Sequence, residues 1–108
     1  FSILLEFAEA GDAVAQCAIG SIYQLELASS TQFKNSLNGT TTVDVAMIWY
    51  KKASAQENGL ASNNLGTIAL LQGRTEEAIR LYRRARAQGF EHSPQPSWIR
   101  KFRRGSKP

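Results

Sequence analysis

Residues 46–56 have the sequence AMIWYKKASAQ, and residues 78–88 repeat it in modified form as AIRLYRRARAQ. Aligned without a gap, the two stretches are identical at five of their 11 positions, and four further positions keep their chemical character. Ala78, Tyr82 and Ala85 stand at i, i+4 and i+7, which places them on one stripe of an α-helix. Small alanines on either side of a tyrosine let a neighbouring helix approach closely. The pattern therefore predicts two equivalent helices.

A second pair of stretches also matches, AQCAIGSIY at residues 15–23 and ASNNLGTIA at residues 61–69. Both have an alanine, a large aliphatic residue, a glycine and an isoleucine in the same order and at helical spacing. Gly20 and Gly66 occupy the same position inside the predicted helices, where a glycine costs about 1 kcal/mol relative to alanine. We expect a tight helix crossing there, at which a Cβ atom would clash.

The two kinds of helix alternate along the chain, and a partial copy of the first stretch, ILLEFAEAG, opens it at residues 3–11. Boundary residues agree with this order. Asp12 is placed to cap a helix that starts near Ala13, and Thr75 to cap a helix with two glutamates in its first turn. Gly89 is expected to end that last helix.

Together these stretches resemble the SEL-one-like repeat, a relative of the tetratricopeptide repeat. The residues that carry the resemblance are AGDAVAQCAIGSIY, AMIWYKKASAQ, NLGTIALLQG and AIRLYRRARAQG, and it covers roughly residues 2–90. It implies an all-α fold, an α/α superhelix in which about five helices form a right-handed solenoid of antiparallel pairs. The chain departs from the repeat at Glu57, where the family usually has glycine.

The predicted domain organisation has repeats over residues 1–90 and a basic tail or cap over residues 91–108. The middle repeat carries an insertion loop at residues 29–42, SSTQFKNSLNGTTT, which is rich in serine, threonine and asparagine. Long loops in compact domains are commonly either functional or disordered. In the tail, Trp98, Ile99 and Phe102 alternate with basic residues. They fit a short helix that caps the solenoid, or a segment that binds an anionic ligand.

The resemblance implies that the first helix of each pair lines the concave side of the solenoid, where repeat proteins bind their partners. In one repeat the groove positions are Val14, Cys17, Ser21, Gln24 and Leu25. In the next they are Leu60, Asn63, Asn64, Thr67, Leu70 and Leu71. The mixture of apolar and amide side chains suits a peptide or a partner helix, because an amide both donates and accepts hydrogen bonds. We therefore expect a protein-binding scaffold.

The charge of the chain is divided unevenly. The formal net charge is +4, yet residues 1–50 contain five acidic residues and one basic residue, whereas residues 51–108 contain four acidic and twelve basic residues. An alternative function is therefore the binding of nucleic acid or an anionic membrane through the basic half. Its candidate residues are Arg80, Arg83, Arg84, Arg100, Lys101, Arg103 and Arg104. We expect these partners to be less favoured than a protein or peptide.

Catalysis, metals and cofactors find little support in the sequence. Cys17 and His92 are the only residues of their types, and a zinc site usually needs four protein ligands, or three and a water. No Gly-rich phosphate loop is present, and the single histidine lies outside the predicted repeats. We expect neither enzyme activity, nor a metal, nor a cofactor.

The first predicted helix carries large apolar residues and lacks a preceding partner helix. These residues are Phe1, Ile3, Leu4, Leu5 and Phe7. We expect this surface to adhere to other proteins, either because further repeats precede it or because the chain self-associates. The chain begins at Phe1 and has no apolar run of the ~20 residues that a membrane span needs. We therefore expect a soluble fragment or processed product without a targeting signal.

Overall fold

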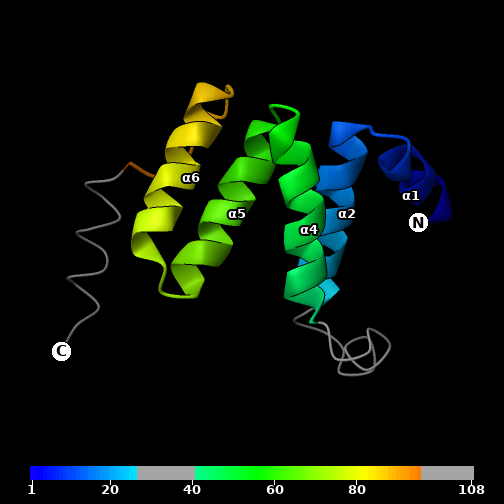
Figure 1. Cartoon of the computed structure of the whole chain (residues 1–108), viewed down its shortest axis with the longest axis horizontal. Helices are drawn as coiled ribbons and strands as arrows, with labels where there is room; N and C mark the ends of the chain where they lie inside the picture. Colours follow the sequence, from blue (N-terminus) through cyan, green and yellow to red (C-terminus); the bar gives the residue numbers. More distant parts are fainter. Residues whose placement is uncertain (27–40, 96–108) are drawn as a thin grey trace. The chain divides into compact units, whose positions relative to one another are not determined.

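The computed structural model describes residues 1–26 and 41–95 of the chain (Figure 1). Over these two ranges it has five α-helices and no β-strand. The helices are α1 (Ser2–Glu9), α2 (Ala13–Glu26), α4 (Thr42–Ala55), α5 (Gly59–Leu71) and α6 (Thr75–Ala87). The all-α fold class predicted from the sequence is confirmed for this part of the chain.

The chain divides into two compact units, Phe1–Asn58 and Gly59–Pro108. In the first unit α2 packs against α1 and α4, and in the second unit α5 packs against α6. Figure 1 shows α2 and α4 running in opposite directions, and likewise α5 and α6. Each unit therefore contains one antiparallel helix pair of the kind that the repeated stretches predict.

Each pair crosses where a glycine of its first helix meets a tyrosine ring of its second helix. A Cβ atom on Gly20 would lie 2.7 Å from ring carbons of Tyr50, and one on Gly66 would lie 2.8 Å from ring carbons of Tyr82. Both distances are shorter than non-bonded carbon contacts in proteins, and both tyrosines are buried. The predicted tight crossing is confirmed in both units, and the ring fills the space that a side chain would otherwise take.

The hydroxyl groups of the two tyrosines are also bonded in the same way. Tyr50 Oη lies 3.1 Å from Ser21 Oγ and donates a hydrogen bond to Gln24 Oε1 at 2.5 Å. Tyr82 Oη lies 2.8 Å from Thr67 Oγ1. The hydroxyl residues in these bonds directly follow the two crossing glycines in the sequence. Each pair thus satisfies a buried phenol with a side chain from the partner helix.

The helices α1, α4 and α6 end with a residue in the left-handed conformation at equivalent positions of the aligned stretches. These residues are Gly11 (φ 107°), Glu57 (φ 68°) and Gly89 (φ 100°). After α4, the N–H of Asn58 donates to the carbonyl of Ala53 at 3.1 Å, which is the long hydrogen bond of a Schellman motif. The end of α4 therefore follows the repeat although glutamate replaces glycine there, and the predicted stop at Gly89 is confirmed.

The N-terminal cap predicted for α2 is present, whereas the cap predicted for α6 is not. Asp12 Oδ1 accepts a hydrogen bond from the N–H of Ala15 at 2.8 Å, so the predicted cap of α2 is confirmed. Thr75 is the first residue of α6 rather than its cap, so that prediction is wrong by one position. The cap position belongs to Arg74, whose guanidinium forms an ion pair with Glu77 in the first turn.

The start of α4 corrects the predicted insertion loop. Thr41 Oγ1 accepts a hydrogen bond from the N–H of Asp44 at 3.1 Å, and α4 begins at Thr42. The last two residues of the predicted loop 29–42 are therefore the cap and the first residue of a helix. The rest of that loop, up to residue 40, lies outside the described residues.

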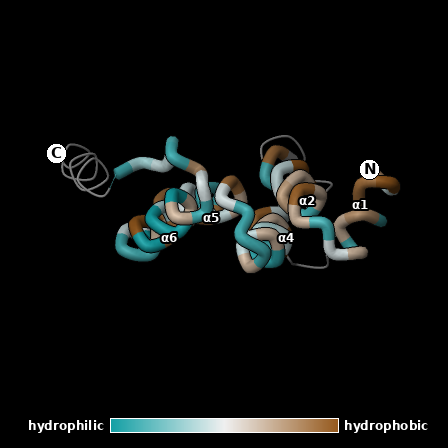
Figure 2. The backbone as a smooth tube through the Cα atoms, turned by 90° about the horizontal axis from the view of Figure 1, so that it is seen from above, coloured by the Kyte–Doolittle hydropathy of each residue, from teal (hydrophilic) through white to brown (hydrophobic). Residues whose placement is uncertain are grey.

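Each unit has a small core of alanines and larger apolar residues. In the first unit the buried residues Ala8, Ala15 and Ile19 are covered by Leu4, Leu5, Tyr23 and Trp49. In the second unit Ala69, Ala78, Ile79 and Tyr82 are covered by Leu70 and Leu81. Figure 2 shows that α1 begins with hydrophobic residues, whereas α6 is largely hydrophilic. The contribution of α6 to the core of the second unit is therefore a narrow apolar stripe.

Residues beyond α6 return onto α5. Ser93 is buried and donates a hydrogen bond from Oγ to Asn63 Oδ1 at 2.8 Å. The guanidinium of Arg86 donates to the carbonyl of Pro94 at 2.7 Å. The described part of the predicted tail therefore packs against α5.

Candidate partner-binding site

The predicted groove residues occur as equivalent pairs, because each residue of α2 aligns with the residue 46 positions later in α5. Val14 aligns with Leu60, and Leu25 aligns with Leu71. The exposed fractions of these side chains are 72% and 45% for the first pair, and 73% and 80% for the second. Packing within a helix pair does not require an apolar side chain at an exposed position. We call these four residues the exposed apolar positions. Two of them lie in each unit, and each is a candidate contact for a partner.

The polar residues between the exposed apolar positions have structural partners. Ser21 and Gln24 are half-buried and bind the hydroxyl of Tyr50, and Thr67 binds the hydroxyl of Tyr82. Both hydroxyl residues also donate to the backbone carbonyl four residues earlier. The side chains predicted to face a ligand therefore help to hold the two helices of each pair together.

The remaining predicted groove residues divide between the core and the surface. Cys17, at a predicted groove position, is buried, and burial raises the pKa of its thiol above the ordinary value of 9.0. Leu70 packs against the core of the second unit. Asn63 accepts the hydrogen bond from Ser93, and Asn64 is half-buried on the same helix. The thiol of Cys17 is buried and neutral, so it is not activated as a nucleophile.

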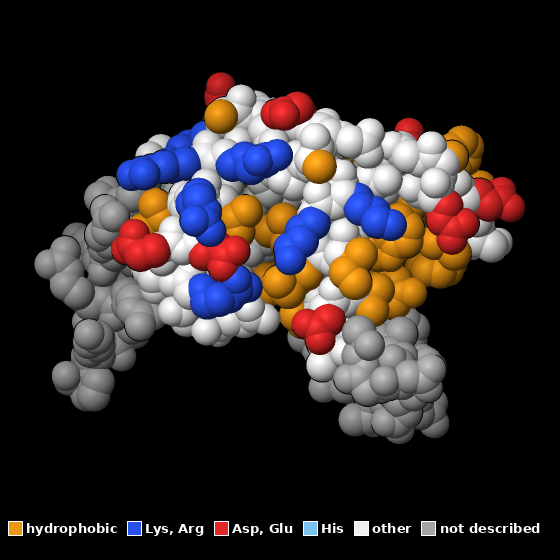
Figure 3. Space-filling model, in the orientation of Figure 1, with side chains coloured by type: hydrophobic (Ala, Val, Ile, Leu, Met, Phe, Trp, Pro, Cys, Tyr) orange, Lys and Arg blue, Asp and Glu red, His pale blue; other side chains and the backbone are white. Residues whose placement is uncertain are grey.

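A shallow hollow of about 310 Å3 between α1 and α2 adjoins the first exposed apolar position. Its lining residues are Leu4, Phe7, Asp12, Val14, Ala15 and Ala18. On α1, Phe1, Ile3 and Phe7 are 60%, 70% and 59% exposed, as predicted, whereas Leu4 and Leu5 pack against the core. Figure 3 shows hydrophobic side chains gathered over the helices of this unit. The sequence indicated the exposed helix but not the hollow, which depends on how α1 packs against α2.

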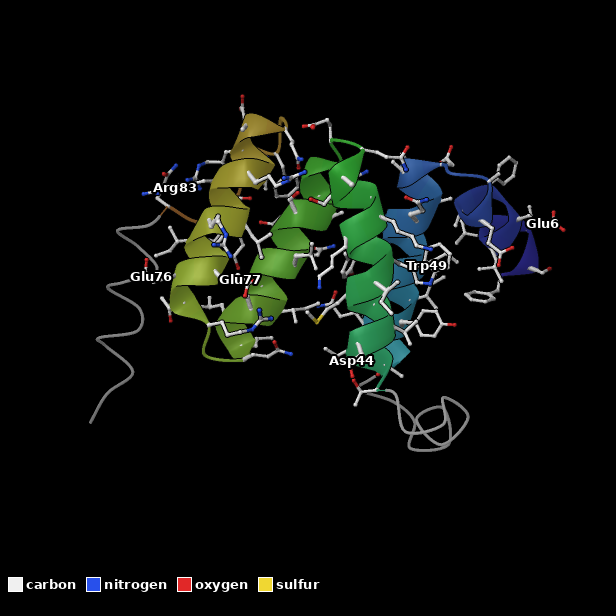
Figure 4. The ribbon with its side chains drawn as sticks, viewed as in Figure 1. Glu6, Asp44, Trp49, Glu76, Glu77 and Arg83 are labelled. Carbon is white, nitrogen blue, oxygen red and sulfur yellow. The ribbon has the colours of Figure 1, made fainter. Side chains whose placement is uncertain are left out.

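The predicted basic patch is described only in its first half. Arg80 lies 3.8 Å from a carboxylate oxygen of Glu77, and both Arg83 and Arg84 are exposed. Figure 4 shows Arg83 on the side of α6 that faces away from α5. Arg100, Lys101, Arg103 and Arg104 lie outside the described residues. The described helix therefore offers exposed arginines that share their face with a glutamate.

Within residues 1–26 and 41–95, no group of three histidine, cysteine or acidic residues is placed to hold a metal ion. None of the described helices is long and apolar enough to cross a membrane. Comparison of the chain with known protein families, with curated protein sequences and with solved structures gave no significant match.

Proposed function

We propose that the chain is a helical-repeat module of the SEL-one-like type that binds a partner protein or peptide on the exposed faces of α2 and α5. The observation that carries this proposal is the pairing of exposed apolar residues, Val14 with Leu60 and Leu25 with Leu71. None of these four side chains is buried in the core of its unit. A bound partner would remove them from water.

The repeated contacts support a stack of equivalent helix pairs. Both units have the same glycine-to-tyrosine crossing and the same hydroxyl hydrogen bond, and their second helices end in the same left-handed turn. Repeat proteins stack such units into a superhelix and bind ligands along its concave surface. We infer that the two pairs are successive repeats of a right-handed α/α superhelix, with α2 and α5 on its inner surface.

The exposed apolar positions supply part of the free energy of binding. Full burial of an aliphatic side chain contributes about 1.5–3 kcal/mol, and each side chain is already partly covered, so each contributes less than this. Four such side chains together contribute less than about 6–12 kcal/mol, whereas association costs about 4–15 kcal/mol, so the partner must make further contacts. Asn64, half-buried on α5, adds an amide that donates to or accepts from a peptide backbone.

Quantitative affinity capture with the full chain tests the proposal. One variant combines Val14→Ser with Leu25→Ser on α2, and a second combines Leu60→Ser with Leu71→Ser on α5. Because these side chains are exposed, the variants should keep the helical content of the original chain. We expect both variants to retain at least tenfold less of the partner captured from source-cell extract, as measured by mass spectrometry.

Ile48→Ser is the matched control, because Ile48 is 53% exposed on α4 and lies outside the proposed face. The control should retain the partner as the unaltered chain does. Equal retention by all three variants would show that the exposed apolar positions do not bind it.

A further inference from the structure

The hollow between α1 and α2 is lined by apolar side chains and one acidic side chain, and none of its lining residues is basic. The first 26 residues contain four acidic residues and no lysine or arginine, so their side chains carry a charge of −4. Asp12 lies in the lining of the hollow. Figure 4 shows Glu6 projecting from the side of α1 that faces away from α2. A ligand of this surface therefore meets exposed apolar groups with negative charge beside them.

The arrangement of side chains around the hollow suits a helix. Leu4 and Phe7 lie one turn apart on α1, and Val14 and Ala18 lie one turn apart on α2. Side chains at i and i+3 or i+4 form ridges, and the groove between two such ridges accepts a ridge from a third helix. Ala15 and Ala18 are small lining residues, so they let the backbone of that helix approach.

We propose that the α1–α2 hollow binds a basic amphipathic helix of the partner protein. This inference rests on the proposed function and names the class of ligand for one part of it. The apolar stripe of the helix covers Phe7 and Val14, and its lysines or arginines lie beside the stripe, toward Asp12. Helix-in-groove recognition of this kind uses apolar anchors at i, i+3 or i+4, and i+7.

The charge also argues against a second copy of the chain as the occupant. Two copies joined symmetrically through this hollow would bring their two Asp12 side chains, which line it, to the same interface. Like charges placed opposite each other across an interface disfavour it. A basic helix instead gains from the same field, both in affinity and in its rate of association.

A fluorescently labelled peptide of about 18 residues, or five helical turns, provides the test. It consists of leucine and lysine, with the leucines at i, i+3, i+4 and i+7. One control peptide has glutamate in place of every lysine, and another has the same composition in shuffled order. Fluorescence anisotropy with the full chain should give at least tenfold tighter binding of the lysine peptide than of either control.

Variants of the chain locate the binding. Phe7→Ser should weaken binding of the lysine peptide at least tenfold, and the double variant Glu6→Lys, Glu9→Lys should weaken it as well. Ile48→Ser, at a 53% exposed isoleucine of α4 that does not line the hollow, should leave the affinity unchanged. Circular dichroism checks that each variant keeps its helices, and Val14→Ser replaces Phe7→Ser should the latter unfold.

Three results would overturn the inference. The first is equal affinity for the lysine and glutamate peptides, and the second is equal weakening by Phe7→Ser and Ile48→Ser. The third is a stable dimer in sedimentation analysis that Phe7→Ser dissociates, which would make a second copy the occupant. None of these results changes the capture of the partner protein that we expect to depend on Leu25 and Leu71. Failure of this inference is therefore distinct from failure of the proposed function.

Discussion

At the scale of single residues, Tyr82 links packing and hydrogen bonding in the second unit. Its ring lies against Gly66, and its hydroxyl lies 2.8 Å from Thr67 Oγ1. Burial raises the pKa of Tyr82 above its ordinary value of 10.0, and the hydrogen bond with Thr67 lowers it by less. The unfolded chain therefore loses the phenolic proton at lower pH than the folded chain. The stability due to the neutral phenol is full below pH 10 and is lost as the pH rises further.

The substitution Tyr82→Phe should lower the free energy of unfolding at pH 7 by about 1 kcal/mol, because it removes one buried hydrogen bond. It should also make stability fall less steeply above pH 10, because the titrating group is gone. Thr67→Val is the matched control, since it removes the same bond and keeps the phenol. Denaturant unfolding at several pH values measures both effects. Equal alkaline slopes for the two variants would contradict this account.

At the scale of helices and their ends, Glu57 stands where the equivalent turns after α1 and α6 use glycine. A residue with a Cβ atom is destabilised by about 1–3 kcal/mol in a sparsely populated backbone conformation, and replacing it by glycine removes this strain. Glycine also has greater freedom in the unfolded chain, which cancels part of the gain in stability. Glu57→Gly should therefore raise the free energy of unfolding by about 0.5–1 kcal/mol. Denaturant unfolding measures the change, with Glu57→Ala as the control that removes the charge alone. An equal gain from Glu57→Ala would show that backbone conformation is not the cause.

The helices and their crossings were predictable because their signals recur in the sequence at fixed spacing. Gly20 with Tyr50 and Gly66 with Tyr82 mark two equivalent crossings, and a chance coincidence of four such residues is improbable. The direction of Cys17 was not predictable, because it depends on the rotation of α2 about its own axis. The cap at Arg74 was missed by one position because threonine is the commoner capping residue.

The candidate site could be predicted only in part for a related reason. Val14 and Leu25 were expected on the binding face, and they are exposed. Ser21 and Thr67 were expected there too, but they bind the tyrosine hydroxyls, since a buried phenol needs a partner that periodicity alone does not reveal. Periodicity identifies the face of a helix, whereas the contacts of each polar side chain depend on the neighbouring helix.

At the scale of the whole molecule, charge and repetition describe different properties of the chain. Twelve of the 13 basic residues lie in residues 51–108, whereas the nine acidic residues are spread over both halves of the sequence, so the two units differ in charge while they share one helix-pair design. A partner that contacts both units would therefore meet equivalent apolar anchors in unlike electrostatic surroundings. Such a difference sets the orientation of a bound partner more than its affinity.

Site-specific photo-crosslinking tests the central claim most directly, because it records contact at one residue. A benzoylphenylalanine replaces Leu25 in one full-length variant and Leu71 in another, and Ile48 in a control, and each is irradiated in source-cell extract. The account predicts that the same partner crosslinks from the Leu25 and Leu71 positions and not from the Ile48 position. Crosslinks from Ile48 alone, or none from Leu25 and Leu71, would contradict it.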